Sequence, residues 1–258
     1  MGCQQVTLMM SAEPHRDDGT YPPLDVLKPV ADGAWIVDSG PLRVLGIPLP
    51  LRMTVIRLGS GELMLHSPTR LTESLKREID AVGRVKHLIA PDVAHWMYLQ
   101  AWQRACPDAT TWAAPGLRER AQVRRSGVRL DHDLTDAAPP EWAGEVEQAL
   151  VRGLGFAEVD FLHRPTRTLV VTDLIVNLEA QKLPALARPA IRLARMVAPD
   201  GEAAPYVRLI VRLRRNEAAL AVSRLLSRNP RRVIFAHGRW FDRDGEAAAR
   251  RSLRWLLP

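Results

Sequence analysis

The sequence predicts an α/β protein built as a four-layer αββα sandwich, in which two β-sheets pack face to face between outer layers of helices. Apolar strand-like segments alternate with amphipathic helical segments along the chain. The order strand pair, helix, strand, helix, strand fills the first half and recurs loosely in the second. The chain has 258 residues, 47% of them hydrophobic and 25% charged. This length and composition suffice for one large α/β domain and exclude a low-complexity or collagenous chain.

In the first half, alternation of apolar and polar residues and turn chemistry predict a β-hairpin among further strands and three helices. The turn Gly59-Ser60-Gly61-Glu62 joins the two hairpin strands, 53–58 and 63–66. Thr72 is a suitable N-cap because apolar residues follow it at helical spacing. The predicted elements are strands at 35–38, 53–58, 63–66, 87–90 and 111–114, and helices at 72–82, 95–105 and 117–125.

The second half begins after a polar, proline-containing loop at 131–144. If residues 164–167 form a turn, His163 pairs near Thr168, and Asp173 lies opposite Glu158. His163 then falls at the far end of the hairpin from Asp173. The predicted elements are strands at 146–151, 156–163, 168–173 and 232–236, and helices at 183–197, 217–226 and 245–257.

The polar, unpatterned residues 1–19 predict a disordered leader, and residues 20–258 form the predicted domain. Cys3 and Cys106 lie far apart and neither has a CxxC partner. A disulfide-stapled scaffold and a cysteine zinc cluster are therefore excluded. We find neither a secretion signal nor an apolar run long enough to cross a bilayer, so we expect a cytoplasmic protein.

The net charge of +7 is concentrated between residues 182 and 232, where the basic residues are nearly all arginine. Helical spacing of Arg188, Arg192 and Arg195 favours a solvated helix face, with weak contact to anionic surfaces such as a membrane as the next interpretation. This stretch contains no recognised nucleic-acid-binding motif in which aromatic residues interleave with the arginines. We therefore expect no specific nucleic-acid partner.

Histidines and carboxylates follow several apolar strands, at the strand ends where α/β proteins place their sites. These residues are His66, Asp92, His95, Asp173 and His237. Imidazole and carboxylate groups are ligands for zinc, iron and manganese. A structural explanation stays open as well: His66 can be a hydrogen-bonded core histidine, and Asp92 can cap the helix expected near His95.

Four strings in order, "HSPTRL" (66–71), "APDVAHW" (90–96), "HRPTRTLVVTDL" (163–174) and "FAHGRW" (235–240), resemble the metallo-β-lactamase superfamily. The resemblance is to an uncharacterised branch, a domain of unknown function, and extends from about Tyr21 onward. It implies the αββα fold and metal-dependent hydrolysis.

The chain departs from the family motif HxHxDH. On that pattern, Ala90 and Asp92 stand where the first two histidines belong, Ala94 replaces the aspartate, and His95 is the last histidine. The histidine that usually precedes the bridging aspartate has no match. The ordinary two-metal site therefore cannot form in its usual composition.

The resemblance assigns Asp173 to the family's bridging aspartate and His237 to its terminal histidine. It implies at most one divalent metal (zinc, iron or manganese), held by His95, Asp173 and His237 with His66 or Asp92 assisting. The expected activity is hydrolysis of a small-molecule ester, thioester, lactone or phosphoester, with these three residues catalytic.

Two other functions remain open. A member of this fold without metal would use the pocket to bind a small anionic ligand, which Arg239 beside His237 would suit. A basic adaptor would bind membrane or nucleic acid through the arginines between 182 and 232.

Overall fold

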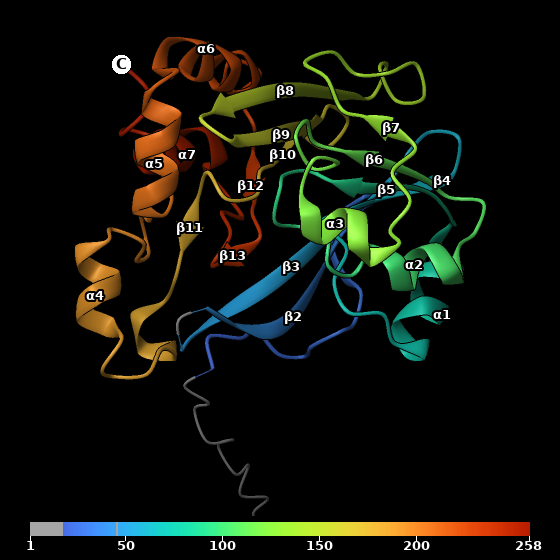
Figure 1. Cartoon of the computed structure of the whole chain (residues 1–258), viewed down its shortest axis with the longest axis horizontal. Coiled ribbons are helices and arrows are strands. Elements are labelled where there is room, and N and C mark those ends of the chain that lie inside the picture. The colour runs from blue at the N-terminus through green and yellow to red at the C-terminus, as the bar shows by residue number, and fades with distance from the viewer. Residues whose placement is uncertain (1–17, 45) are drawn as a thin grey trace, which may run out of the picture.

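The first sheet has seven strands in the order β1-β2-β3-β4-β5-β6-β7, antiparallel from β1 to β4 and parallel from there on (Figure 1). The structure is a computed structural model that describes residues 18–44 and 46–258. The strands are β1 (Lys28–Ala31), β2 (Ala34–Val44), β3 (Ile47–Arg57), β4 (Glu62–His66), β5 (Arg84–Ala90), β6 (Thr110–Ala113) and β7 (His132–Asp133).

The second sheet has four strands in the order β12-β10-β9-β8, and a short parallel pair, β11 with β13, lies beside it. β9 and β10 form the expected hairpin, with Thr168 opposite His163. The strands are β8 (Val146–Gly153), β9 (Phe156–His163), β10 (Thr168–Val170), β11 (Val176–Asn177), β12 (Arg232–Ile234) and β13 (His237–Gly238).

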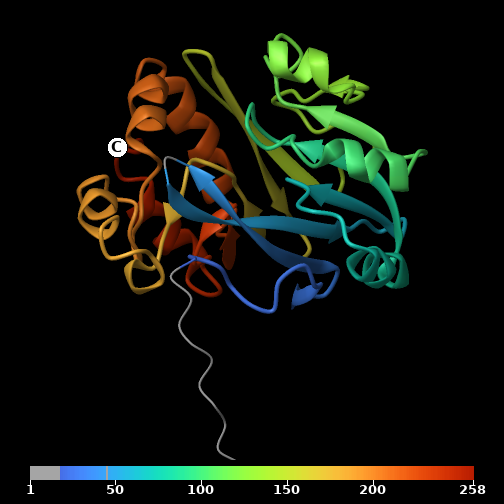
Figure 2. The ribbon, with the colours of Figure 1, turned by 60° about the horizontal axis from the view of Figure 1, so that its bottom comes forward.

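Helices cover the outer faces of both sheets (Figure 2). The first sheet is covered by α1, α2 and α3, and the second by α5, α6 and α7. The four-layer αββα prediction is therefore confirmed. The helices are α1 (Glu73–Val82), α2 (Leu99–Ala105), α3 (Ala121–Ser126), α4 (Arg188–Leu193), α5 (Pro205–Arg212), α6 (Arg215–Leu226) and α7 (Gly245–Ser252).

A core of apolar side chains joins the inner faces of the two sheets. Met64 and Ile89 from the first sheet pack in one cluster with Val159 and Phe161 from the second. Trp142, in the loop between the sheets, belongs to the same cluster and is buried. Burying these side chains from water holds the two sheets together.

Several elements differ in extent from the sequence prediction. The expected helix at 95–105 begins only at Leu99, and the one at 183–197 shrinks to α4. Pro184 and Pro189 limit that segment, because proline cannot occupy a helix interior. The sequence patterns do not predict β1, β7, β11, β13 or α5. Proline at the first position of α5 is favourable for a helix start, although it looks like a breaker in the sequence.

Of the expected leader, residues 1–17 lie outside the described residues, and Asp18 and Gly19 lie within them. Gly19 is buried, and its backbone N–H donates to the carbonyl of Lys182 at 2.8 Å. Lys182 in turn donates from Nζ to the carbonyl of Thr20. Within the described residues, no helix is both long and apolar enough to span a bilayer.

The core between the sheets predicts the outcome of one matched pair of leucine substitutions. Leu134 is 1% exposed in this core, whereas Leu186 is 97% exposed. We expect Leu134→Ala to lower the free energy of unfolding by about 2–5 kcal/mol and Leu186→Ala by less than about 0.5 kcal/mol. Urea denaturation of the metal-free protein measures both. Equal effects would contradict the assignment of Leu134 to the core.

Candidate metal centre

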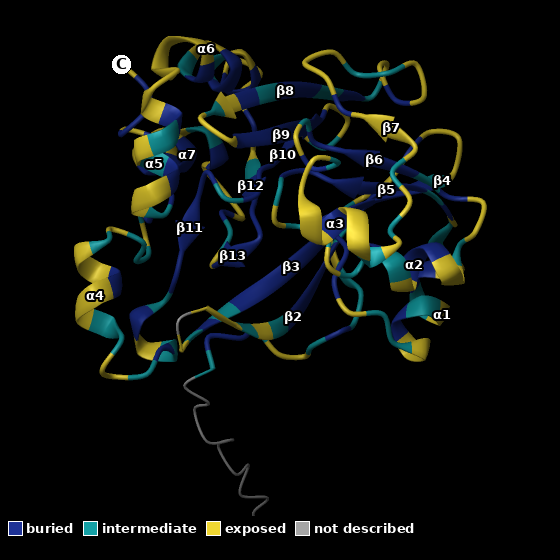
Figure 3. Ribbon diagram, in the orientation of Figure 1, coloured by how far each residue is buried: buried dark blue, intermediate teal, exposed yellow. Residues whose placement is uncertain are grey.

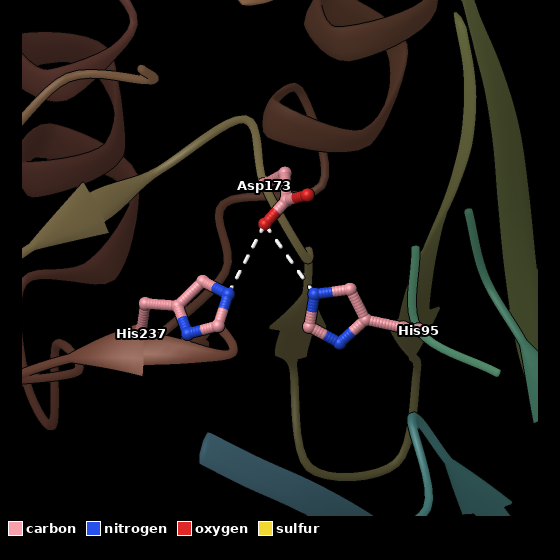
Figure 4. Close-up of side chains that lie close together, drawn as sticks. All are labelled: His95, Asp173 and His237. Atoms are coloured by element: carbon pink, nitrogen blue, oxygen red, sulfur yellow. Dashed lines mark ion pairs between the residues drawn. The ribbon is translucent and has the colours of Figure 1, made fainter. Parts of the chain in front are cut away.

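Three polar side chains from distant parts of the sequence meet at one edge of the sandwich (Figure 4). His95 lies in the turn after β5, Asp173 follows β10, and His237 lies in β13. Asp173 Oδ1 is 3.4 Å from Nε2 of His95 and 3.3 Å from Nε2 of His237. One potential ligand atom from each residue falls within 4.8 Å of the others. This geometry can hold one cation with two nitrogens and one oxygen.

Each imidazole is oriented by a contact on its outer nitrogen. Nδ1 of His237 is 2.7 Å from the carbonyl oxygen of Pro50 and must donate to it, because a carbonyl only accepts. Nδ1 of His95 is 2.7 Å from the hydroxyl of Ser67. When Nδ1 carries the proton, the lone pair of Nε2 faces Asp173. Histidines that bind metals are held by outer contacts of this kind.

Glu158 fixes the backbone that carries Asp173. The N–H groups of Thr172 and Asp173 donate to its two carboxylate oxygens at 2.6 and 2.8 Å. Glu158 lies in β9 and is fully buried. The predicted position of Glu158 opposite Asp173 is therefore confirmed. Its carboxylate oxygens are engaged with this backbone, so Glu158 positions the loop.

Buried carboxyl groups give this edge an excess of negative charge. Burial raises the pKa of Asp92 to about 6 and that of Asp160 to about 7. Burial and the neighbouring Asp160 also raise the pKa of Glu158. Within the described residues, neither these carboxyls nor Asp173 forms an ion pair with lysine or arginine. Uncompensated buried charge is costly, so such a site favours a bound cation.

Without a cation, the imidazole of His95 carries the compensating positive charge. Burial alone would lower the pKa of His95, but the carboxylates of Asp92 and Asp173 outweigh it and raise the pKa to about 9. Burial would likewise raise the pKa of Asp173, but His95 and His237 hold it well below its ordinary value. A metal ion would take over the role of the proton on His95, since metal binding displaces ligand protons.

Asp92 and His66 lie beside the three-residue cluster and outside it. Oδ1 of Asp92 accepts the N–H groups of Ala94 and His95, so it caps the turn ahead of α2 and not α2 itself. Its Oδ2 is buried, has no hydrogen-bond partner among the described residues and lies 3.9 Å from Nε2 of His95. This buried oxygen beside the cluster is left without compensation, which is a second sign that the site suits a cation.

His66 ends β4 and is 2% exposed, with its ring edge-on to Phe161. Burial, followed by the charge of His95, lowers the pKa of His66 to about 3, so the ring is neutral. Its Nε2 has no hydrogen-bond partner in the part of the chain that the structure describes. His66 is therefore a neutral, buried ring close enough to His95 to be affected by its charge, and its assisting role as a ligand stays a prediction.

Arg52, which the sequence analysis did not select, holds the strand that carries His237. Its guanidinium is buried and donates from Nη1 to the carbonyls of Phe235 and Gly238 at 3.0 and 2.7 Å. Nη2 pairs with Asp38 at 2.6 Å. A single arginine within the apolar run 51–56 was the available signal. Arg52 ties β3 of the first sheet to the residues on both sides of His237.

Gly238 allows β13 to approach β11 closely. A Cβ atom at this position would lie 2.1 Å from the carbonyl oxygen of Asn177, and its φ is +101°. Both conditions favour glycine. Gly238, the residue after His237, therefore allows the strand that carries the His237 imidazole to pack closely against β11.

Many of the arginines between 182 and 232 have partners within the protein. Arg208 and Arg195 pair with the buried carboxylate of Glu202. Arg224 pairs with Asp136 at 2.8 Å, and Arg228 with Glu147 at 3.0 Å. Contact of this stretch with anionic surfaces stays a prediction.

The contacts of Arg52 predict a large loss of stability on its replacement. Arg52→Met leaves buried Asp38 with Lys28 alone and frees two carbonyls, so we expect a loss of about 3–5 kcal/mol in the free energy of unfolding. Arg84→Met is the control, because Arg84 and Asp108 form an exposed pair; we expect less than about 1 kcal/mol. Chemical denaturation measures both. A small loss for Arg52→Met would show that it does not hold the site.

The hydroxyl of Ser67 predicts a change in metal affinity. Ser67→Ala removes the contact that orients His95, so we expect the dissociation constant for zinc to rise about 10- to 100-fold. Competition with a chromophoric chelator measures it. Ser60→Ala, at an exposed turn position, is the control and should leave the constant unchanged. An unchanged affinity in Ser67→Ala would contradict the orienting role.

Solved metallo-β-lactamases share this fold. The enzyme from Pontibacter korlensis is 16% identical with a TM-score of 0.59, over 88% of this chain and 98% of that one. The enzyme from Hirschia baltica is 10% identical with a TM-score of 0.59, over 90% and 97%. FIM-1 from Pseudomonas aeruginosa, in its mono-zinc form, is 12% identical with a TM-score of 0.59, over 90% and 94%.

No curated protein matches the sequence. Residues 32–206 match the family described as a domain of unknown function, DUF4336. That match covers most of the chain, including β2 to β11 and the residues His95 and Asp173. The chain therefore belongs to the DUF4336 family and has the metallo-β-lactamase fold.

Proposed function

We propose that the protein is a metal-dependent hydrolase whose centre holds one divalent cation between His95, Asp173 and His237. The observation that carries this proposal is the shared position of three ligand atoms, with Asp173 Oδ1 facing Nε2 of both histidines. The orienting contacts from Pro50 and Ser67 support it, as does the buried excess of carboxylates.

A single cation agrees with the replaced motif. Ala90 and Ala94 offer no ligand atoms where the family motif has a histidine and an aspartate. Two imidazoles and one carboxylate suit zinc, iron(II) or manganese. FIM-1, which shares the fold, has been solved in a mono-zinc form, so the fold is compatible with one occupied position.

A divalent cation in this centre supplies Lewis acidity and makes water nucleophilic at neutral pH. The side chains of the protein have separate tasks. His95 and His237 present Nε2 in fixed directions, and Glu158 keeps Asp173 between them. The orphaned Oδ2 of Asp92 is available to accept a hydrogen bond from water at the centre. The apolar walls of the adjoining cavity exclude bulk water.

The metal-free anion-binding alternative has no support among the described residues. Within 18–44 and 46–258, no lysine or arginine lines the cavity next to His95, Asp173 and His237. Arg239, which the sequence offered as an anion ligand, is exposed and lines a different surface hollow.

Metal content tests the proposal directly. Protein made without a histidine tag and reconstituted with zinc should contain about one zinc per chain by elemental mass spectrometry. His95→Ala and His237→Ala each remove one ligand and should lose most of it. His132→Ala, at an exposed position away from the cluster, is the control and should retain it. Full zinc content in the His95 and His237 variants would overturn the ligand assignment, and no zinc in the parent protein would overturn the proposal.

A further inference from the structure

A cavity of about 430 Å³ opens beside the His95–Asp173–His237 cluster. Its walls come from three separate parts of the chain. Leu49 and Leu51 project from β3, Ile191 and Met196 from α4 and the residues after it, and Val207 from α5. A space of this size accommodates a small organic molecule. Figure 1 shows α4 and α5 on the same side of the molecule as β11, which leads away from Asp173.

The charge on the cavity wall is confined to the cluster itself. Among the described residues, His95, Asp173 and His237 are its only charged or imidazole side chains. The remaining wall is mostly aliphatic. A ligand that fills the cavity must therefore be apolar over most of its length and polar at the end next to the cluster.

We infer that the substrate is a carboxylic ester, thioester or lactone that carries an aliphatic acyl chain, with the chain in this cavity and the carbonyl group at the cluster. The inference rests on the proposed hydrolase function and narrows its substrate class. Phosphoesters fit poorly, because Asp173 lies in the cluster with Asp92 beside it, and no lysine or arginine among the described wall residues would offset a phosphate charge.

The reaction consumes one water molecule per acyl bond. The water oxygen forms a bond to the acyl carbon, and the bond from that carbon to the alkoxide or thiolate leaving group breaks. One proton of the water ends on the leaving group. The other is released from the carboxylic acid product at neutral pH.

Chain length is the variable that tests the cavity. Each methylene buried from water strengthens binding by about fourfold, so two methylenes should give about tenfold or more. We would measure 1-hexanol, 1-octanol and 1-decanol on the metal-free protein by displacement of a neutral naphthylamine fluorophore. The expected result is a dissociation constant that falls about tenfold or more at each step. Equal dissociation constants for the three alcohols would overturn the inference.

A matched pair of tryptophan variants places the binding in the cavity. Ala194 lines the cavity, whereas its neighbour Leu193 is 86% exposed and does not. Ala194→Trp should fill part of the space and weaken 1-decanol binding at least tenfold, and Leu193→Trp should leave it unchanged. Equal dissociation constants for 1-decanol in the two variants would show that the alcohol binds elsewhere on the protein, and would overturn the inference.

The second measurement is ester hydrolysis by the zinc-loaded protein. We expect kcat/KM for p-nitrophenyl octanoate to exceed that for the acetate at least tenfold, with p-nitrophenyl phosphate not hydrolysed. One zinc per chain without chain-length dependence would reject the acyl cavity and leave the proposed centre intact. Chain-length-dependent alcohol binding in a protein that takes up no zinc would reject hydrolysis, and with it the substrate assignment.

Discussion

Glu158 accepts the backbone N–H groups of Thr172 and Asp173 from within β9, and the candidate centre depends on this contact. It turns the chain after β10 so that the Asp173 carboxylate stands between two imidazoles. The arrangement keeps carboxyl groups out of water, which costs free energy unless they are protonated or paired. Raised pKa values of Asp92 and Asp160 express that cost. A divalent cation bound by Asp173 and the histidines would relieve it.

The same centre also depends on the packing of the two sheets. Its three side chains follow strands of different sheets, and Arg52 in β3 fixes the carbonyls on both sides of His237. Pro50, two residues earlier in β3, orients the imidazole of His237 itself. Figure 3 shows β3 as buried along most of its length, so these contacts are shielded from water. Packing of the two sheets therefore both stabilises the fold and sets the geometry of the site.

The replaced motif residues have a structural consequence at the turn after β5. Asp92, which the resemblance aligns with a histidine of the motif HxHxDH, caps this turn by accepting the N–H groups of Ala94 and His95. These two hydrogen bonds fix the backbone of the turn, in which Ala90 and Ala94 carry no ligand atoms. Only His95 projects from this turn into the three-residue cluster.

Local patterns in the sequence were sufficient to select the polar residues that follow the strands and to set the hairpin register, although β10 and β12 end earlier than predicted, at Val170 and Ile234. His95, Asp173 and His237 each follow an apolar segment, and the turn at 164–167 places Glu158 opposite Asp173. Contacts between distant segments left no such pattern. The partners Ser67 and Pro50 are separated from their histidines by 28 and 187 residues. The apolar cavity was equally hidden, because its walls form only when α4 and α5 pack near β3.

X-ray absorption at the zinc edge of the reconstituted protein tests the centre most directly, because it reports the ligand atoms themselves. The account predicts nitrogen and oxygen ligands at about 2.0–2.2 Å, with outer-shell scattering from two imidazoles. In His237→Ala, which should lose most of its zinc, the signal from this centre should fall accordingly. Sulfur at about 2.3 Å, which would indicate cysteine ligands, or a spectrum unchanged in His237→Ala would contradict it.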